Sequence, residues 1–122
     1  MAKKDSKKLT KKEIVRQERI KIRKQFKEWS IKIRDRDGNK CRICGAVKYI
    51  HAHHLIPREN KEFRFDLDNG IALCAKHHKY SLEISPHKNP IVFILWLQKN
   101  RKKQWNIIQK WIKNNEFRGN RI

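Results

Sequence analysis

Apolar residues near the N-terminus of the 122-residue chain recur every three or four positions. This spacing and the absence of glycine and proline predict an amphipathic helix from Thr10 to Arg34. Thr10 and Glu13 resemble a capping box at the start of that helix. The apolar stripe consists of Ile22, Phe26, Trp29 and Ile33. We expect this stripe to pack against the remainder of the protein.

The middle of the chain has shorter apolar runs separated by turn residues. The sequence Asp37-Gly38-Asn39 is typical of a turn and is predicted to end the first helix. One strand is predicted from Lys48 to His54 and a second from Ile71 to Cys74. A further helix is expected from about Ala75 to Glu83. This order predicts a small hairpin followed by a helix.

The C-terminal third again has a helical pattern. Asn89 is placed to cap a helix and Pro90 to occupy its first position, followed by the apolar run from Ile91 to Leu97. Residues 101–103 either interrupt the helix or lie on its exposed side, and helical spacing resumes at Trp105. No apolar stretch approaches the roughly 20 residues of a membrane span, and no signal-peptide pattern is present. We therefore expect a cytoplasmic protein without a membrane partner.

The three cysteines and one histidine predict a structural zinc site. Cys41 and Cys44 are separated by two residues, and so are Cys74 and His77. These spacings allow four side chains to surround one ion as a tetrahedral Cys3His set. Three cysteines cannot all pair as disulfides, and a reducing cytosol disfavours such pairs. Burial of small apolar thiols is the alternative, but it does not account for the two matching spacings.

Three histidines remain near this set, namely His53, His54 and His78. Adjacent residues on a strand point to opposite faces, so His53 and His54 are suited to different roles. One can bind a metal while the other transfers a proton. The spacing favours His77 on zinc and leaves His78 free, although the reverse arrangement is an alternative.

These motifs resemble the HNH endonuclease family. The resemblance covers about residues 34–90, through RDGNKCRICG, HAHHLIPR and FRFDLDNGIALCAKHH. It implies a ββα-metal finger in which His53 and His78 hold one divalent cation, His54 is the general base and Asn69 steadies the loop that carries His54. Many relatives have a fourth cysteine at the position of His77. It also implies cleavage to 5′-phosphate and 3′-hydroxyl ends, and small proteins of this kind are common in phages and mobile elements.

The chemistry of these residues agrees with that resemblance. An unperturbed imidazole has a pKa near 6.5, so a neutral His54 can accept a proton from water near neutral pH. A cation on His53 and His78 would act as a Lewis acid on the leaving 3′ oxygen. Mg²⁺, Mn²⁺, Ni²⁺ and Zn²⁺ are all candidates for that cation. Asn69 precedes Gly70, so a turn role is compatible with its support of the loop.

Two further histidines have no role assigned by the resemblance. His51 and His87 are each expected to be ordinary surface or core residues. His51 shares a strand face with His53, so it is also placed to support the metal or to compete for it.

The charge of the chain indicates a polyanionic partner. The formal net charge is +20, with 15 Lys/Arg against 5 Asp/Glu in residues 1–36 and 8 against 1 in residues 90–122. Such an excess favours a phosphate backbone, most directly double-stranded DNA. A homodimer and a phage packaging or replication partner are further expectations. If the chain is phage-encoded, its compartment is the host cytoplasm.

We therefore predict an α+β protein, a zinc-bound ββα-metal (HNH) finger flanked by basic N- and C-terminal helices. Residues 1–36 form a basic tail and DNA-binding helix, residues 37–89 the nuclease core with its structural zinc, and residues 90–122 a basic helical extension. The predicted function is metal-dependent hydrolysis of DNA phosphodiester bonds, by nicking or double-strand cleavage. The alternative is a non-catalytic zinc module that only binds nucleic acid, and an RNA substrate is a third interpretation.

Overall fold

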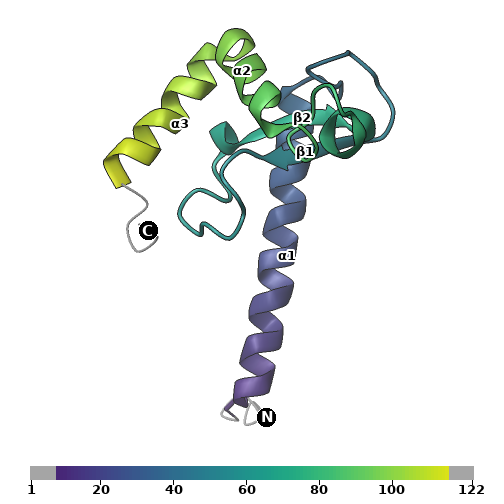
Figure 1. Ribbon diagram of the computed structural model, residues 1–122. Helices are drawn as coiled ribbons and strands as arrows, with labels where there is room; N and C mark the ends of the chain where they lie inside the picture. The colour runs from purple at the N-terminus through teal and green to yellow at the C-terminus, as the bar shows by residue number, and fades with distance from the viewer. Residues whose placement is uncertain (1–7, 116–122) are drawn as a thin grey trace.

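The computed structural model describes residues 8–115 and has the predicted mixture of helices and a small sheet (Figure 1). The predicted N-terminal tail and the last residues of the C-terminal extension therefore lie largely outside the described residues. The elements in chain order are α1 (Lys11–Arg36), β1 (Ile50–His54), η2 (Leu67–Asn69), β2 (Gly70–Cys74), η3 (Lys76–Tyr80), α2 (Pro90–Asn100) and α3 (Lys102–Asn115). This arrangement is the α+β class that the sequence predicted.

The long helix α1 begins with the predicted capping box. The Thr10 backbone N–H donates to Glu13 Oε1 over 2.8 Å, and the Glu13 N–H donates to Thr10 Oγ1 over 3.1 Å. The helix ends at Arg36, two residues later than predicted, with Asp37 as its C-cap and Gly38 beyond it at a φ of +75°. Trp29 and Ile33 are buried against the hairpin. The N-terminal half of α1 extends well away from the sheet (Figure 1).

The sheet consists of β1 and β2, paired antiparallel with His53 opposite Ile71. The first strand starts two residues later than predicted because Tyr49 has a φ of +56°, which is incompatible with an extended strand. A Cβ added to Gly70 would lie 2.5 Å from Trp29 Cζ2 and 2.7 Å from Ile33 Cδ1. Glycine at position 70 therefore allows α1 to lie directly on β2.

The helix predicted from Ala75 to Glu83 is wrong in its extent. The structure has only the π-helical turn η3, which is closed by a hydrogen bond from the Ser81 N–H to the Lys76 carbonyl. Beyond it, the Ser81 hydroxyl accepts from the Ile84 N–H, and the Ser85 hydroxyl donates to the Ser81 carbonyl. These side-chain bonds compete with continued helix, so the chain turns after one winding.

Helices α2 and α3 pack on the other side of the sheet from α1 (Figure 1). As predicted, Pro90 is the first residue of α2, and the Asn89 side chain caps it by accepting from the Val92 N–H. The chain breaks between the two helices at Arg101, which settles the alternative left open by the sequence.

Two clusters of buried side chains hold this layer in place. The first cluster comprises Cys41, Ile71, Leu73, Cys74, Phe93 and Leu97, and the second comprises Ile56, Phe63 and Ile108. Both lie between the hairpin region and helices α2 and α3. No helix among residues 8–115 combines the length and the apolar character needed to cross a membrane.

Candidate metal centres and active site

The four residues predicted to bind zinc lie together. Their ligand atoms are all within 4.8 Å of one another. Cys41 and Cys44 come from the turn after α1, Cys74 ends β2, and His77 lies in η3. The Cys44 and Cys74 Sγ atoms are 3.8 Å apart, and His77 Nδ1 lies 3.4 Å from Cys74 Sγ and 3.9 Å from Cys41 Sγ.

The local backbone explains how the first cysteine pair is presented. The Gly45 N–H donates to the Cys41 carbonyl over 2.8 Å, and the Cys41 N–H donates to the Ala46 carbonyl over 2.9 Å. Gly45 has a φ of +79°, a conformation that glycine adopts at little cost. Burial raises the pKa of the Cys41 thiol, but backbone hydrogen bonds from Cys74, Cys44 and Ile43 outweigh burial and lower it overall. Such bonds favour the thiolate that binds metal.

The distances in this group fit a tetrahedral zinc ion. With zinc–sulfur bonds of about 2.3 Å and zinc–nitrogen bonds of about 2.05 Å, tetrahedral sulfur pairs are about 3.8 Å apart and sulfur–nitrogen pairs about 3.6 Å. The measured separations of 3.8, 3.4 and 3.9 Å lie close to these values. The donor set of three thiols and one imidazole is also one that zinc prefers.

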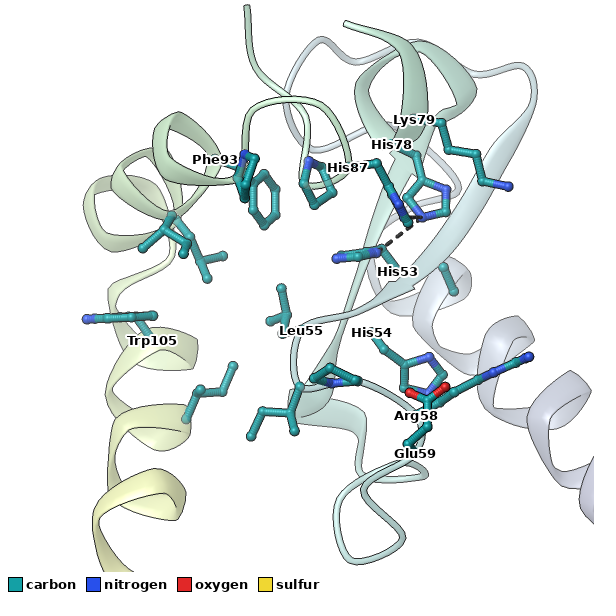
Figure 2. Close-up of a pocket in the computed structure, with 18 of the residues that line it drawn as sticks. His53, His54, Leu55, Arg58, Glu59, His78, Lys79, His87, Phe93 and Trp105 are labelled. Atoms are coloured by element: carbon teal, nitrogen blue, oxygen red, sulfur yellow. Dashed lines mark hydrogen bonds between the residues drawn. The ribbon is translucent and has the colours of Figure 1, made fainter. Parts of the chain in front are cut away.

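A second candidate metal group consists of His53, His78 and His87, whose ligand atoms likewise lie within 4.8 Å of one another. His78 Nε2 is 3.1 Å from His53 Nδ1 and 3.2 Å from His87 Nε2 (Figure 2). Tetrahedral imidazole ligands would be about 3.3 Å apart, so this group also fits a divalent cation. The structure brings the predicted pair His53 and His78 together and adds His87, which the sequence analysis left outside the site.

Both central histidines of this group are held neutral. Burial first, and then the charges of His78 and His87, lower the pKa of His53 to about 3. Burial, His87 and His51 lower the pKa of His78 to about 4. Neutral imidazoles present the lone pairs that a cation requires.

His51 contacts the opposite nitrogen of His78. The two Nδ1 atoms are 3.0 Å apart. If His78 binds a cation through Nε2, its Nδ1 carries the ring proton and donates it to His51. His51 therefore contacts the side of the His78 ring that faces away from the metal group, and it orients His78.

His54 points to the other face of β1 from His53, as the strand alternation predicts. Its ring stacks on Trp29 with centroids 3.8 Å apart, and the Phe26 ring lies nearly perpendicular to it with a centroid distance of 5.7 Å. Its Nε2 is 2.8 Å from the Arg64 carbonyl oxygen. Burial is the largest influence on the pKa of His54 and lowers it, although the Arg64 carbonyl acts in the opposite direction.

Asn69 is fully buried and anchors the segment that follows His54. Its Oδ1 accepts from the Ile56 N–H, and its Nδ2 donates to the Ile56 carbonyl over 3.0 Å and to the Phe63 carbonyl over 3.2 Å. Three hydrogen bonds thus join the start and the middle of the loop between β1 and η2. Because Arg64 directly follows Phe63, these bonds also position the carbonyl that contacts His54.

A cavity of about 830 Å³ is lined by histidines from both faces of β1. Its wall includes His53, His54, His78 and His87 at one end and apolar side chains of α2 and α3, such as Phe93 and Trp105, at the other (Figure 2). Arg58, Glu59 and Lys79 complete the polar end. The cavity therefore combines a candidate cation group, an oriented imidazole and positive charge.

Comparison with known protein families supports this resemblance. Residues 41–81 match the model of a family described as HNH endonuclease. This segment, about a third of the chain, is similar to the HNH endonuclease family. The predicted resemblance is thereby confirmed, and similarity to a nuclease family implies a nucleic-acid substrate. No curated protein and no solved structure matches the chain.

The HNH segment contains the predicted zinc group, His53, His54, Asn69 and His78, but it ends before His87. The ring of His87 approaches the metal group because the chain turns back after η3 through the Ser81 and Ser85 bonds. The ligand spacing gave no indication that this turn brings His87 back to the metal group, so His87 was missed. The proximity of Pro86 and Pro90, which favour a turn rather than a helix, was the available clue.

Proposed function

We propose that this protein is a metal-dependent HNH endonuclease that hydrolyses DNA phosphodiester bonds, with His54 as its general base. The observation that carries the proposal is the hydrogen bond from His54 Nε2 to the Arg64 carbonyl, in a cavity that also contains the histidine metal group. A non-catalytic zinc scaffold has no need of an imidazole oriented in this way.

The hydrogen bond to Arg64 fixes the tautomer of His54. A carbonyl oxygen can only accept, so Nε2 carries the ring proton and donates it. In the neutral ring, Nδ1 then keeps its lone pair and can accept a proton from the attacking water. The stacked Trp29 ring prevents the imidazole from rotating away.

The cation group supplies the remaining chemistry. His53, His78 and His87 would hold the catalytic divalent cation, which when bound neutralises charge on the phosphate and on the leaving oxygen. Mg²⁺, Mn²⁺, Ni²⁺ and Zn²⁺ remain the candidates. His51 positions His78 from behind, and Asn69 holds the loop whose Arg64 carbonyl orients His54.

The thiol group would hold a structural zinc ion. Cys41, Cys44, Cys74 and His77 are its ligands in this proposal, which makes residues 37–89 a zinc-bound ββα-metal core. The flanking segments 1–36 and 90–122 would add basic surface for double-stranded DNA. A structural ion also stabilises a small protein whose apolar core is limited.

A plasmid-nicking assay tests the proposal. His54→Ala should lower the nicking rate by roughly 100-fold or more, because general-base catalysis contributes at least that much. DNA affinity and zinc content should stay unchanged, and added imidazole should restore part of the rate. Unchanged nicking in His54→Ala would contradict the role of His54, and absence of nicking in the wild type with all four cations would favour the non-catalytic module.

The same assay separates the substrate classes. Plasmid, single-stranded DNA and RNA are compared under each of the four cations. The proposal expects cleavage of plasmid DNA, whereas exclusive cleavage of RNA would overturn it.

A further inference from the structure

A second, smaller pocket lies between α1 and the loop that follows β1, and it has a volume of about 380 Å³. Four arginines, one phenylalanine and one glutamate are its principal lining residues: Arg19, Arg23, Phe26, Arg58, Glu59 and Arg64. We call this the arginine pocket. Two of the arginines come from successive turns of α1 and two from the loop, so segments more than 30 residues apart in sequence place their guanidinium groups together.

The aromatic ring of Phe26 organises the loop arginines. The Cζ atoms of Arg58 and Arg64 lie 5.6 and 5.5 Å from the Phe26 ring centroid, and Arg64 also lies 5.2 Å from that of Phe65. These cation–π contacts hold the guanidinium groups in place without neutralising them. These contacts hold the two loop arginines in place, and the exposed Arg19 and Arg23 extend from α1 beside them.

No carboxylate within residues 8–115 forms an ion pair with these arginines. The ion pairs in that part of the chain join only Asp37 to Arg36 and Arg101. Arg64 Nε is buried and has no hydrogen-bond partner. Glu59 is the only acidic lining residue against four positive charges, so the pocket carries an uncompensated charge of +3. Like charges in such proximity are unfavourable unless an anion is bound.

The arginine pocket adjoins the candidate active site. The Arg64 carbonyl accepts from His54, while the Arg64 side chain lines the pocket. Arg58 and Glu59 line both this pocket and the large cavity, and Figure 2 shows them next to His54. An anion in the arginine pocket would thus lie beside the proposed general base.

We propose that the arginine pocket binds a backbone phosphodiester that flanks the bond to be cut, so that α1 and the loop after β1 contact the same nucleic-acid strand. This inference rests on the proposed nuclease function. Guanidinium groups suit phosphate because their planar N–H donors pair with two oxygens at once. A phosphate bound there positions the strand against His54, and the arginines act as positioning residues rather than catalytic ones.

A matched pair of double variants tests the pocket by DNA binding. Both are made in the His54→Ala protein with zinc bound and without a catalytic cation, so cleavage does not interfere. Arg19→Gln/Arg23→Gln removes two charges from the pocket, and Lys21→Gln/Lys24→Gln removes two exposed charges from the opposite side of α1. Affinity for a fluorescent DNA duplex is measured by anisotropy over a series of salt concentrations.

The pocket variant should bind DNA roughly tenfold or more weakly, as expected for loss of charged hydrogen bonds. Its log–log salt dependence should become shallower by about 1, the contribution of one phosphate contact. The Lys21/Lys24 variant should change both quantities much less. Equal effects of the two double variants would overturn the proposal and reduce the pocket to general positive charge.

Two further measurements identify the ligand and separate this proposal from the nuclease function. The NMR resonance of the Arg64 Nε–H should shift on addition of the duplex. Inorganic phosphate should shift it only at much higher concentration. An equal response to inorganic phosphate would assign the site to a free anion instead. With His54 intact, Arg58→Lys should raise KM more than it lowers kcat, because lysine keeps the charge but not the planar fork. Failure of the nuclease proposal would instead appear as unchanged nicking in His54→Ala.

Discussion

At the scale of single residues, the position of His54 depends on three contacts of different kinds. Trp29 covers one ring face, Phe26 lies nearly perpendicular to the ring, and the Arg64 carbonyl accepts from Nε2. Each contact restricts a different motion of the imidazole. Together they leave Nδ1 as the free nitrogen, which is the property that a general base requires.

The tautomer of His54 can be measured directly. In the zinc-loaded protein without a catalytic cation, we expect Nε2 to carry the proton and Nδ1 to be unprotonated, because the Arg64 carbonyl can only accept. Long-range ¹H–¹⁵N correlation NMR distinguishes the two ring nitrogens. Protonation of Nδ1 alone would show that the proposed base has no lone pair available.

Gly70 provides a residue-scale test of the contact between α1 and β2. Gly70→Ala places a methyl group 2.5 Å from Trp29 and 2.7 Å from Ile33. Overpacking of this kind should lower the free energy of unfolding by about 1–3 kcal/mol. Because Trp29 stacks on His54, nicking should also fall.

Gly38→Ala is the control for that substitution. A Cβ at Gly38 meets no atom within 4 Å, so its cost arises only from the φ of +75°. Urea denaturation should show a loss of stability for both variants, whereas only Gly70→Ala should impair nicking. Wild-type stability and nicking in Gly70→Ala would mean that α1 can move away from β2 without consequence.

At the scale of elements, the π-helical turn η3 links the two candidate metal groups. His77 faces the thiols and His78 faces His53 and His87, although the two residues are adjacent in sequence. Whatever fixes His77 therefore also fixes His78. Loss of the zinc group should disturb the histidine group more than the reverse, because the zinc group is also anchored by Cys74 at the end of β2.

Ligand substitutions test this coupling. Cys44→Ser should abolish zinc binding and, through η3, also weaken binding of the catalytic cation and lower nicking. His87→Ala should weaken binding of the second cation by about tenfold or more while leaving one zinc per chain. Metal analysis and titration with Ni²⁺ or Mn²⁺ measure both quantities. A Cys44→Ser protein that keeps full nicking without zinc would refute the coupling.

Local sequence rules account for most elements but not for the completed site. The capping box at Thr10, the proline at the start of α2 and the strand ending at Cys74 depend on neighbouring residues, so the sequence predicted them. The residues of the thiol group were predictable because their spacing within each pair reflects local backbone geometry. His87 was not, since its position results from side-chain bonds of Ser81 and Ser85 that no periodicity reveals.

At the scale of the whole molecule, most positive charge in the described residues 8–115 forms no ion pair with an acidic side chain there. In residues 8–115, ion pairs form only around Asp37, although the chain has 32 Lys/Arg. The other cationic side chains of residues 8–115 keep an unneutralised charge that favours contact with a polyanion. Their concentration in α1 and the C-terminal helices places this charge on either side of the HNH segment.

Asp37 connects α1, the sheet and the C-terminal helices. Its carboxylate is 3% exposed, forms ion pairs with Arg36 over 2.9 Å and Arg101 over 3.3 Å, and accepts from the Ala72 N–H over 2.9 Å. It thereby joins the end of α1, the middle of β2 and the junction of α2 and α3. Burial raises the pKa of this carboxyl, but the hydrogen bonds and charges of Arg36, Ala72 and Arg101 outweigh burial and lower it overall.

Asp37→Asn should therefore destabilise the protein by about 3 kcal/mol at pH 7, because Arg101 is left half-buried without its carboxylate. The matched control Asp35→Asn removes an exposed carboxylate and should change stability by less than about 0.5 kcal/mol.

The contribution of Asp37 to stability depends on pH. Since its pKa is lowered in the folded state, the contribution is complete above the unfolded pKa of about 3.9 and is lost as the pH falls through the folded-state pKa. The difference in unfolding free energy between wild type and Asp37→Asn should thus be constant near neutrality and narrow below about pH 4. Urea titrations of both proteins at matched pH measure this difference, and the shared metal sites cancel in the subtraction. A difference that widens in acid would show that folding raises the pKa of Asp37 instead of lowering it.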